Sequence, residues 1–321
     1  MINQTINYQP MIARVMENIN RVIVGKEDVT KLSLVALLAK GHVLLEDVPG
    51  VGKTMLVRAL AKSLHCSFHR IQFTPDLLPS DVTGVSIYHP HTQQFEFRKG
   101  PIIGDIVLAD EVNRTSPKTQ SALLEAMEEN SVTVDGETVQ IDQPFFVMAT
   151  QNPIEYEGTY PLPEAQLDRF LLKLRMGYPT EAEEAQMLMQ MEGTHPIEDL
   201  EAVLEREDLI ALQKQVNDVF IDPIVQQYIV QLVRQTRKTS DVYLGVSPRG
   251  AIALMKAAKA YALIHNRDYV VPDDIKYLAP FVLAHRIILT PEAKFADKNS
   301  EQLIANILKD IPVPTRKEYA E

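Results

Sequence analysis

The sequence predicts an α/β protein: a three-layer α/β/α core around a parallel sheet, two β-hairpin insertions, and then an all-helical domain. Three observations carry this prediction. An apolar run at 42–45 leads through a glycine-containing loop into the helical pattern of 55–61. Apolar runs at 106–109 and 145–149 each end in polar residues, as strands buried on both faces of a parallel sheet do. Beyond residue 196, apolar residues recur at helical spacing.

Length and composition describe a globular protein of about two domains. The chain has 321 residues, 45% of them hydrophobic and 23% charged. We expect a core domain at 1–192 and a helical domain at 193–321, joined near 193–196. No apolar run approaches the roughly 20 residues of a membrane span, and the polar first ten residues contain no signal region. With the single cysteine, Cys66, these features predict a cytoplasmic protein.

The charge balance argues against nucleic acid as the partner. The chain carries 32 basic and 43 acidic residues, a net charge of −11. Contacts to phosphate backbones require a basic surface, so nucleic-acid binding is not expected from the overall charge.

The remaining elements follow from periodicity and turn signals. Helices are predicted over 9–24 and 27–38, a strand over 67–73, a hairpin within 84–100, a helix after Ser116, a hairpin over 131–141 and a strand over 171–176. His89 and His91 lack ligand partners at metal-binding spacing, so we interpret them as an exposed hairpin tip. A helix from 181 holds Met187, Leu188, Met189 and Met191, which we interpret as core. Later helices are predicted at 206–216, 223–237, 248–264, 272–284 and 300–308.

The loop between the first strand and its helix has the composition of a phosphate-binding P-loop. Glycines allow a tight turn in which backbone N–H groups and the helix N-terminus point at a polyphosphate. The lysine would reach the β- and γ-phosphates and the threonine would hold Mg²⁺. The first residue, an aspartate, departs from the usual glycine, and its carboxylate suits phosphate binding only if it points out of the loop or is paired. The candidate nucleotide-binding residues are Asp47, Val48, Pro49, Gly50, Val51, Gly52, Lys53, Thr54 and Met55.

Polar residues after two buried strands complete the candidate site. Asp110 and Glu111 end the run that begins at 106, about 56 residues after the P-loop, at the sheet edge where parallel sheets bind ligands. Asp110 would orient Mg²⁺ directly or through water, and Glu111 would act as general base toward the attacking water. Asn152 could position that water or contact the γ-phosphate, although an Asn-Pro after a strand is often only a turn.

These motifs in this order resemble the AAA+ ATPases, and within them the MoxR family. The strings at 44–54, 110–115, 123–129, 149–153 and 167–170 carry the resemblance, which extends from about 24 to 288. It implies Walker A roles for Lys53 and Thr54, Walker B roles for Asp110 and Glu111, and a sensor 1 role for Asn152. It further implies an arginine finger at Arg169 and a sensor 2 arginine at Arg249, with Arg114 as a candidate interface contact. Otherwise, Arg169 is a salt-bridging surface residue and Arg249 a solvated residue at a helix start.

The resemblance also implies a function. Relatives form rings, six subunits being the default, hydrolyse ATP with Mg²⁺ and remodel client proteins in a chaperone-like way, commonly together with proteins that carry von Willebrand factor A domains. The two hairpins are expected to face the ring pore. A nucleic-acid motor is the alternative, although the hairpin tips lack the Lys or Arg needed to follow phosphates. A magnesium-chelatase-like subunit and a non-hydrolysing switch are further alternatives; Glu111 argues against the switch.

Overall fold

A parallel sheet organises the protein, as predicted. The computed structural model describes residues 9–152, 159–190 and 195–314. Its five-stranded sheet has the order β2-β5-β8-β1-β9, and each neighbouring pair is parallel. The strands are β1 (Val43–Glu46), β2 (Phe68–Gln72), β5 (Ile106–Asp110), β8 (Phe146–Gln151) and β9 (Leu172–Leu174).

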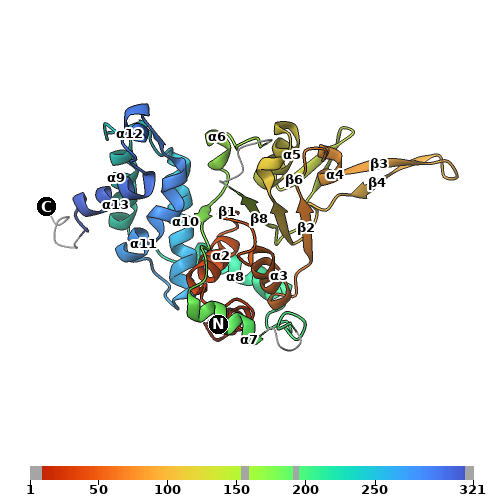
Figure 1. Ribbon diagram of the computed structural model, residues 1–321, viewed down its shortest axis with the longest axis horizontal. Helices are drawn as coiled ribbons and strands as arrows, with labels where there is room; N and C mark the ends of the chain where they lie inside the picture. Colours follow the sequence, from red (N-terminus) through yellow and green to blue (C-terminus); the bar gives the residue numbers. More distant parts are fainter. Residues whose placement is uncertain (1–8, 153–158, 191–194, 315–321) are drawn as a thin grey trace, which may run out of the picture.

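The central strands bury both faces, which explains their continuous apolar runs. In β5, Ile106 and Leu108 belong to one hydrophobic cluster, whereas Val107 and Ala109 belong to another. The first cluster includes side chains of α1 (Gln9–Asn20), α2 (Glu27–Leu38) and α3 (Lys53–Ser63), and the second those of α4 (Pro79–Thr83) and α5 (Pro117–Glu129). Helices therefore cover both faces, giving the three predicted layers (Figure 1).

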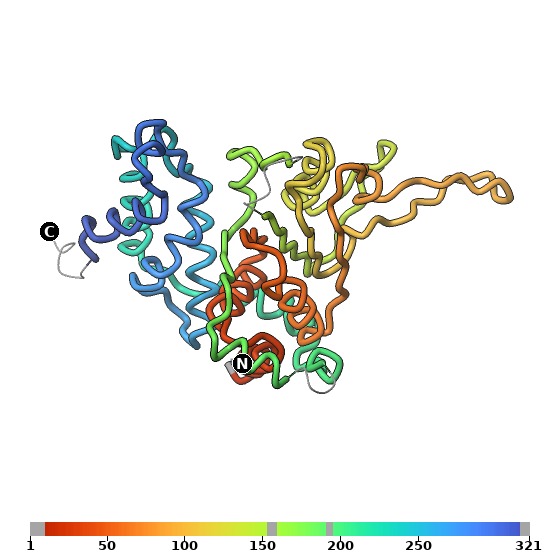
Figure 2. Tube along the Cα trace, in the orientation of Figure 1, coloured from red at the N-terminus to blue at the C-terminus, as the bar shows by residue number. Residues whose placement is uncertain are grey.

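Both predicted hairpins are present. They are β3 (Gly84–His89) with β4 (Gln94–Lys99), and β6 (Ser131–Val134) with β7 (Glu137–Gln140). Asp135 and Gly136 have φ values of 51° and 83°, as a type I′ turn requires. The β3–β4 hairpin projects from the body of the molecule (Figure 2). His89 pairs with exposed Glu96 at 2.8 Å, and no group of three or more metal-ligating side chains occurs among the described residues.

The C-terminal part is helical with one short exception. It contains α8 (Arg206–Asp218), α9 (Pro223–Thr236), α10 (Pro248–Ile264), α11 (Pro272–Leu283), the 3-10 helix η2 (Ala284–Arg286), α12 (Pro291–Phe295) and α13 (Ser300–Asp310). The expectation of an all-helical domain missed an antiparallel pair, β10 (Val242–Leu244) and β11 (Ile288–Leu289). Strands of two and three residues are too short to show a period of two. None of the described helices is long and apolar enough to cross a bilayer.

The segment after residue 194 first packs against the α/β core. Lys62 donates to the carbonyl of Ile197 at 2.8 Å, and Arg206 donates to Asp105 at 3.0 Å. The amide of Gln213, on α8, donates to the Leu37 carbonyl at 2.8 Å. The segment 195–218 therefore packs against the α/β layers before the chain enters α9, and the boundary between 192 and 193 stays a prediction.

The interpretation of the methionine-rich helix as core is wrong. Helix α7 (Glu181–Gln190) has no buried residue, and Leu188 and Met189 are exposed. Met191 lies outside the described residues. The helical spacing of these apolar side chains is real, but a sequence pattern cannot show whether another element covers them.

Candidate active site

The P-loop joins β1 to α3 in a conformation that depends on its glycines. Gly50 and Gly52 have φ values of 86° and 92°, in the region that favours glycine. Gly52 is the N-cap of α3, so Lys53 and Thr54 begin the helix. The first N–H groups of a helix have no partner within it, and at this end they are available to bind an anion.

Asp47 points away from this loop, which explains how a carboxylate is tolerated there. It is buried, and its carboxylate accepts hydrogen bonds from the backbone N–H groups of Met176 and Gly177, the latter at 3.1 Å. Its φ is not positive, so the backbone does not require glycine at this position. The amino group of Lys53 donates to the Asp47 carbonyl at 2.9 Å. Asp47, the residue that departs from the usual P-loop pattern, therefore links the loop to the residues that follow β9.

Five further residues that were predicted for the site come together in one cleft. A cavity of about 260 Å³ is lined by P-loop residues together with Lys53, Thr54, Asp110, Glu111 and Asn152. Burial lowers the pKa of the Lys53 ammonium, while the carboxylates of Asp110, Asp47 and Glu111 act in the opposite direction. The carboxyl ends of β5 and β8 thus bring acidic and amide side chains to the start of α3.

The two acidic residues are held by hydrogen bonds across strands. Oδ1 of Asp110 accepts from the Thr150 hydroxyl at 2.6 Å, and Oδ2 accepts from Arg70 at 2.6 Å. Oε2 of Glu111 accepts from the amide of Gln72 at 2.7 Å and from Arg114 at 3.0 Å. Arg114, the candidate interface residue, therefore contacts Glu111 within its own chain.

Glu111 also has an unusual backbone conformation. Its φ of 58° and ψ of 48° lie in the left-handed region, which a residue with a side chain seldom adopts. Its N–H donates to the Thr150 hydroxyl at 2.9 Å. The turn that follows β5 therefore directs this carboxylate into the cleft.

Arg70 and Gln72 also line the cleft, and the sequence analysis did not find them. They lie on β2, which pairs with β5 so that Gln72 is opposite Asp110. The only sequence signal was the alternation of polar and apolar residues along this strand. That signal could not show which strand lies beside it.

The donor set suits a magnesium ion. The Thr54 hydroxyl and the Asp110 carboxylate are hard oxygen ligands of the kind that Mg²⁺ prefers, and they line the same cleft. The guanidinium of Arg70 on Asp110 shows that this carboxylate has room for a cation beside it. Thr54 and Asp110 are therefore the residues that would hold the ion.

A second, apolar cavity adjoins the P-loop and was also missed. It measures about 480 Å³ and shares Pro49, Gly50, Gly52 and Met55 with the polar cleft. Its other walls include the segment 22–24, Met176, and Met187 and Leu188 of α7. An apolar cavity beside a phosphate-binding loop can hold the base and sugar of a nucleotide. The exposed apolar side chains of α7 thus line a cavity and do not belong to the core.

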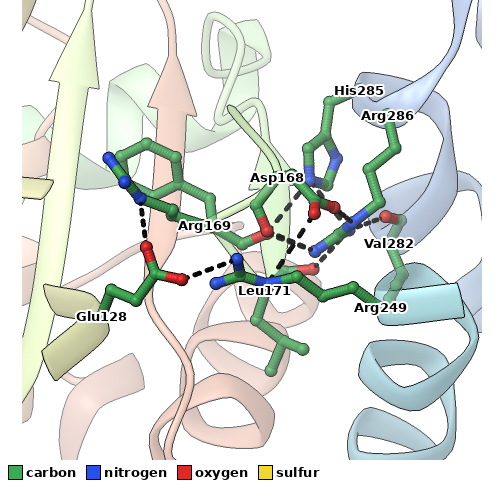
Figure 3. A network of polar contacts seen from close by, with 9 residues as sticks. Glu128, Asp168, Arg169, Leu171, Arg249, Val282, His285 and Arg286 are labelled. Carbon is green, nitrogen blue, oxygen red and sulfur yellow. Dashed lines mark hydrogen bonds and ion pairs between the residues drawn. The ribbon is translucent and has the colours of Figure 1, made fainter. Parts of the chain in front are cut away.

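The two predicted arginines lie together, away from this cleft. Arg169 donates to Oε2 of Glu128 at 2.6 Å, and Arg249 donates to Oε1 of the same carboxylate at 2.9 Å (Figure 3). The hydrogen bond from Arg169 and the charge of Arg249 lower the pKa of Glu128. The described lining of the cleft includes neither arginine. Glu128, in the last turn of α5, therefore accepts hydrogen bonds both from Arg169 in the α/β part and from Arg249 in the helical part.

A third arginine fixes the same region to the C-terminal helices. Arg286, in η2, donates to Asp168 at 2.7 Å (Figure 3). It also donates to the carbonyl of Phe170 at 2.7 Å. Burial lowers its pKa, and the charge of Asp168 opposes this shift. The segment 168–170, which carries Arg169, is therefore anchored to the helical part.

The fold and the site together define a P-loop nucleotide-binding protein of the AAA class. A family model described as "ATPase family associated with various cellular activities (AAA)" matches residues 42–172, and an AAA lid domain model matches 234–307. A Bacillus subtilis protein, "Uncharacterized protein YeaC", is 66% identical over 96% of both chains. "Chaperone MoxR1" of Mycobacterium tuberculosis is 42% identical over 94% of this chain and 82% of its own. A solved structure of a putative ATPase from Cytophaga hutchinsonii superposes with a TM-score of 0.90 at 41% identity, covering 96% of both chains.

The chain belongs to the MoxR family of AAA ATPases. The predicted family is thereby confirmed, and so is the fold class of an α/β core followed by a helical lid.

Proposed function

We propose that this protein is a ring-forming, Mg²⁺-dependent ATPase that remodels partner proteins. The observation that carries the proposal is the convergence of Lys53, Thr54, Asp110, Glu111 and Asn152 on one cleft at the carboxyl edge of the sheet. The similarity to "Chaperone MoxR1" supports the remodelling role.

In this proposal each residue has one task. The N–H groups of the P-loop and Lys53 bind the β- and γ-phosphates. Glu111 accepts a proton from the attacking water, and the Asn152 amide holds that water or the γ-phosphate in place. Thr54 and Asp110 hold Mg²⁺, which neutralises charge on the phosphate oxygens. The apolar cavity beside the loop holds the nucleoside.

The arginines support a site shared between subunits. Phosphoryl transfer concentrates charge on the γ-phosphate, and an arginine finger there is worth roughly 10³- to 10⁵-fold in rate. Arg169 and Arg249 lie together on Glu128 and do not line their own cleft. We therefore propose that Arg169 acts on the nucleotide of a neighbouring subunit in a homo-oligomeric ring, with six subunits as in other AAA rings, and that Arg249 is the sensor 2 arginine of the lid.

The clients are proposed to be proteins. Remodelling would occur in the cytoplasm, and proteins with von Willebrand factor A domains are the expected adaptors. The tip of the β3–β4 hairpin carries the pair of His89 and Glu96 and no Lys or Arg, which favours a protein client over a nucleic acid.

The Glu111→Gln variant tests the catalytic assignment. Glutamine keeps the size of the side chain but cannot accept the proton, so we expect ATP binding as in the wild type and hydrolysis lowered by about 10²- to 10⁴-fold. Equilibrium binding of labelled ATP and phosphate release would be measured on the same preparations. Glu292→Gln removes the same charge at an exposed position in α12 and should leave both unchanged. Normal turnover of Glu111→Gln would contradict the assignment.

The same variant tests the client class. Held in the ATP state, Glu111→Gln should retain client proteins during affinity purification, whereas Lys53→Ala, which cannot hold the phosphates, should not. ATP hydrolysis that is stimulated by DNA and falls steeply with salt would instead favour the nucleic-acid motor.

A further inference from the structure

The Arg70 guanidinium is hydrogen-bonded to Asp110, the carboxylate that a magnesium ion would need. Its Nη2 donates to Oδ2 of Asp110 at 2.6 Å and its Nε to the same oxygen at 3.2 Å. The other oxygen, Oδ1, accepts from the Thr150 hydroxyl at 2.6 Å. Both oxygens of Asp110 therefore already have donors, and one of the donors is a cation from the same chain.

Hydrogen bonds also connect Arg70, through Gln72, to Glu111, the proposed base. The same Nη2 donates to Oε1 of Gln72 at 2.6 Å, and the Gln72 amide donates to Oε2 of Glu111 at 2.7 Å. One guanidinium is thus shared between the metal ligand Asp110 and the side chain that holds Glu111. All four residues line the same cleft.

The two cations cannot occupy this carboxylate together. Asp110 is buried, and a buried carboxylate without a counter-charge is costly. A guanidinium and a divalent ion a few ångströms apart repel each other strongly where water is scarce. The Arg70 side chain is 48% exposed, so it can leave Asp110 for solvent without being buried elsewhere. Exchange of one cation for the other is the arrangement that these constraints allow.

We propose that Arg70 is an internal counter-cation that exchanges with Mg²⁺ at Asp110. The inference rests on the proposed function and deepens it, because it concerns the metal ion of the same site.

The test measures nucleotide binding and not turnover. Equilibrium binding of a fluorescent ADP would be titrated with Mg²⁺ for the wild type and Arg70→Gln in the full chain, with the thermal midpoint as a check of folding. Without its competitor, Mg²⁺ should reach half-maximal effect at a concentration lower by on the order of tenfold, which corresponds to about 1.4 kcal/mol. Arg58→Gln is the matched control, because it removes the same charge from an exposed position on α3.

Two further variants separate charge from geometry. Arg70→Lys keeps the charge, so its Mg²⁺ dependence should stay close to that of the wild type, although an ammonium lacks the planar fork that joins Asp110 to Gln72. Gln72→Leu leaves Arg70 on Asp110, so its Mg²⁺ dependence should not move.

The outcomes are distinguishable. A Mg²⁺ requirement in Arg70→Gln that equals that of Arg58→Gln overturns the inference alone, as does a higher requirement, which would make Arg70 a phosphate ligand. A shifted Mg²⁺ requirement in Arg70→Lys would overturn the exchange even if Arg70→Gln fails to fold. A shifted Mg²⁺ requirement in Gln72→Leu would overturn the assignment of the effect to the Arg70–Asp110 pair. A wild type that binds no nucleotide with Mg²⁺ would overturn the proposed function together with the inference.

Discussion

The cleft beside the P-loop and the arginine cluster of Arg169, Arg249 and Arg286 both contain ion pairs within the chain, but these pairs have different surroundings. In the cleft, Asp110 and Glu111 are paired with Arg70 and Arg114, and with Lys53 they line a cavity of about 260 Å³. In the arginine cluster, each guanidinium is paired with a carboxylate, and the pairs of Arg249 and Arg286 join the α/β part to the helical part. The pairs of the cleft therefore border a space that can hold a ligand, whereas the cluster connects two parts of the protein.

The arginines of the cluster differ in how much of each side chain is exposed to solvent. The Arg286 side chain is 3% exposed, whereas those of Arg169 and Arg249 are 28% and 48% exposed. A buried, paired arginine has no low-energy alternative partner, because breaking such a pair leaves a charge without compensation. Arg169, which is half-buried, and Arg249, which is exposed, can exchange Glu128 for another anion at lower cost than Arg286 can exchange Asp168. The contrast teaches that Arg286 is structural and that Arg169 and Arg249 are available to a phosphate.

His42 connects the two regions. Its Nδ1 accepts from the N–H of Val147 at 3.0 Å, and its Nε2 lies 3.1 Å from the carbonyl of Met127, next to Glu128. Its own carbonyl accepts from the N–H of Leu171 at 2.8 Å. One buried residue at the start of β1 thus links the sheet to both segments that carry the cluster.

The largest expected effect is the loss of Arg169. Arg169→Ala should lower ATP turnover by roughly 10³- to 10⁵-fold, because the γ-phosphate loses a stabilising guanidinium, while ATP binding remains. Turnover and binding would be measured separately. The decisive control is an equimolar mixture of Arg169→Ala and Glu111→Gln subunits. Some interfaces in it combine the intact Glu111 with the intact Arg169, so activity should reappear if the arginine acts between subunits. No recovery in rings that demonstrably mix would contradict the shared site.

The next effect concerns His42 and pH. Burial lowers the pKa of His42 to about 4 from 6.5, opposed by the hydrogen bond to Met127. The unfolded state therefore takes up a proton at a higher pH than the folded state does. The stabilisation is complete above pH 6.5 and is lost as pH falls toward 4, by about 3 kcal/mol in total.

His42→Gln provides the comparison for this prediction. The variant should be less stable at pH 7, because the N–H of Val147 loses its acceptor, but its free energy of unfolding should fall less steeply between pH 6.5 and 4. Denaturant unfolding at several pH values measures both slopes. Equal slopes would show that another group, such as the buried His285, carries the pH dependence.

The smallest of the three effects tests Asp47. Asp47→Ala removes the acceptor for two N–H groups, those of Met176 and Gly177, and an unsatisfied buried donor costs about 1–3 kcal/mol. We expect a thermal midpoint lower by a few degrees and nucleotide binding much less affected than in Lys53→Ala. Asp47→Asn keeps one acceptor oxygen and should fall between the wild type and Asp47→Ala. Loss of nucleotide binding with unchanged stability would instead make Asp47 part of the phosphate site.

Short-range patterns predicted much of the fold and of the cleft. The strand, P-loop and helix around Lys53, the acidic end of β5 and the Asp135-Gly136 turn were readable because neighbouring residues set their backbone conformation and hydrogen bonds. Buried strands were recognisable from their apolar runs, because both faces of this sheet are covered. The exposed α7 and the short β10–β11 pair were not, because what covers a helix, or pairs with a very short strand, is decided elsewhere in the chain.

The sequence by itself therefore determined the main elements, the family and the polar groups that come together in one cleft. Only the tertiary structure decided what the charged side chains contact. Asp47 bonds to a residue 129 positions away, Arg70 to one 40 positions away, and Glu128 to Arg249 at a separation of 121. Such pairs depend on the order of strands in the sheet and on where the helical lid packs. No local period or motif encodes them, because the free energy that selects them arises only when the distant segments meet.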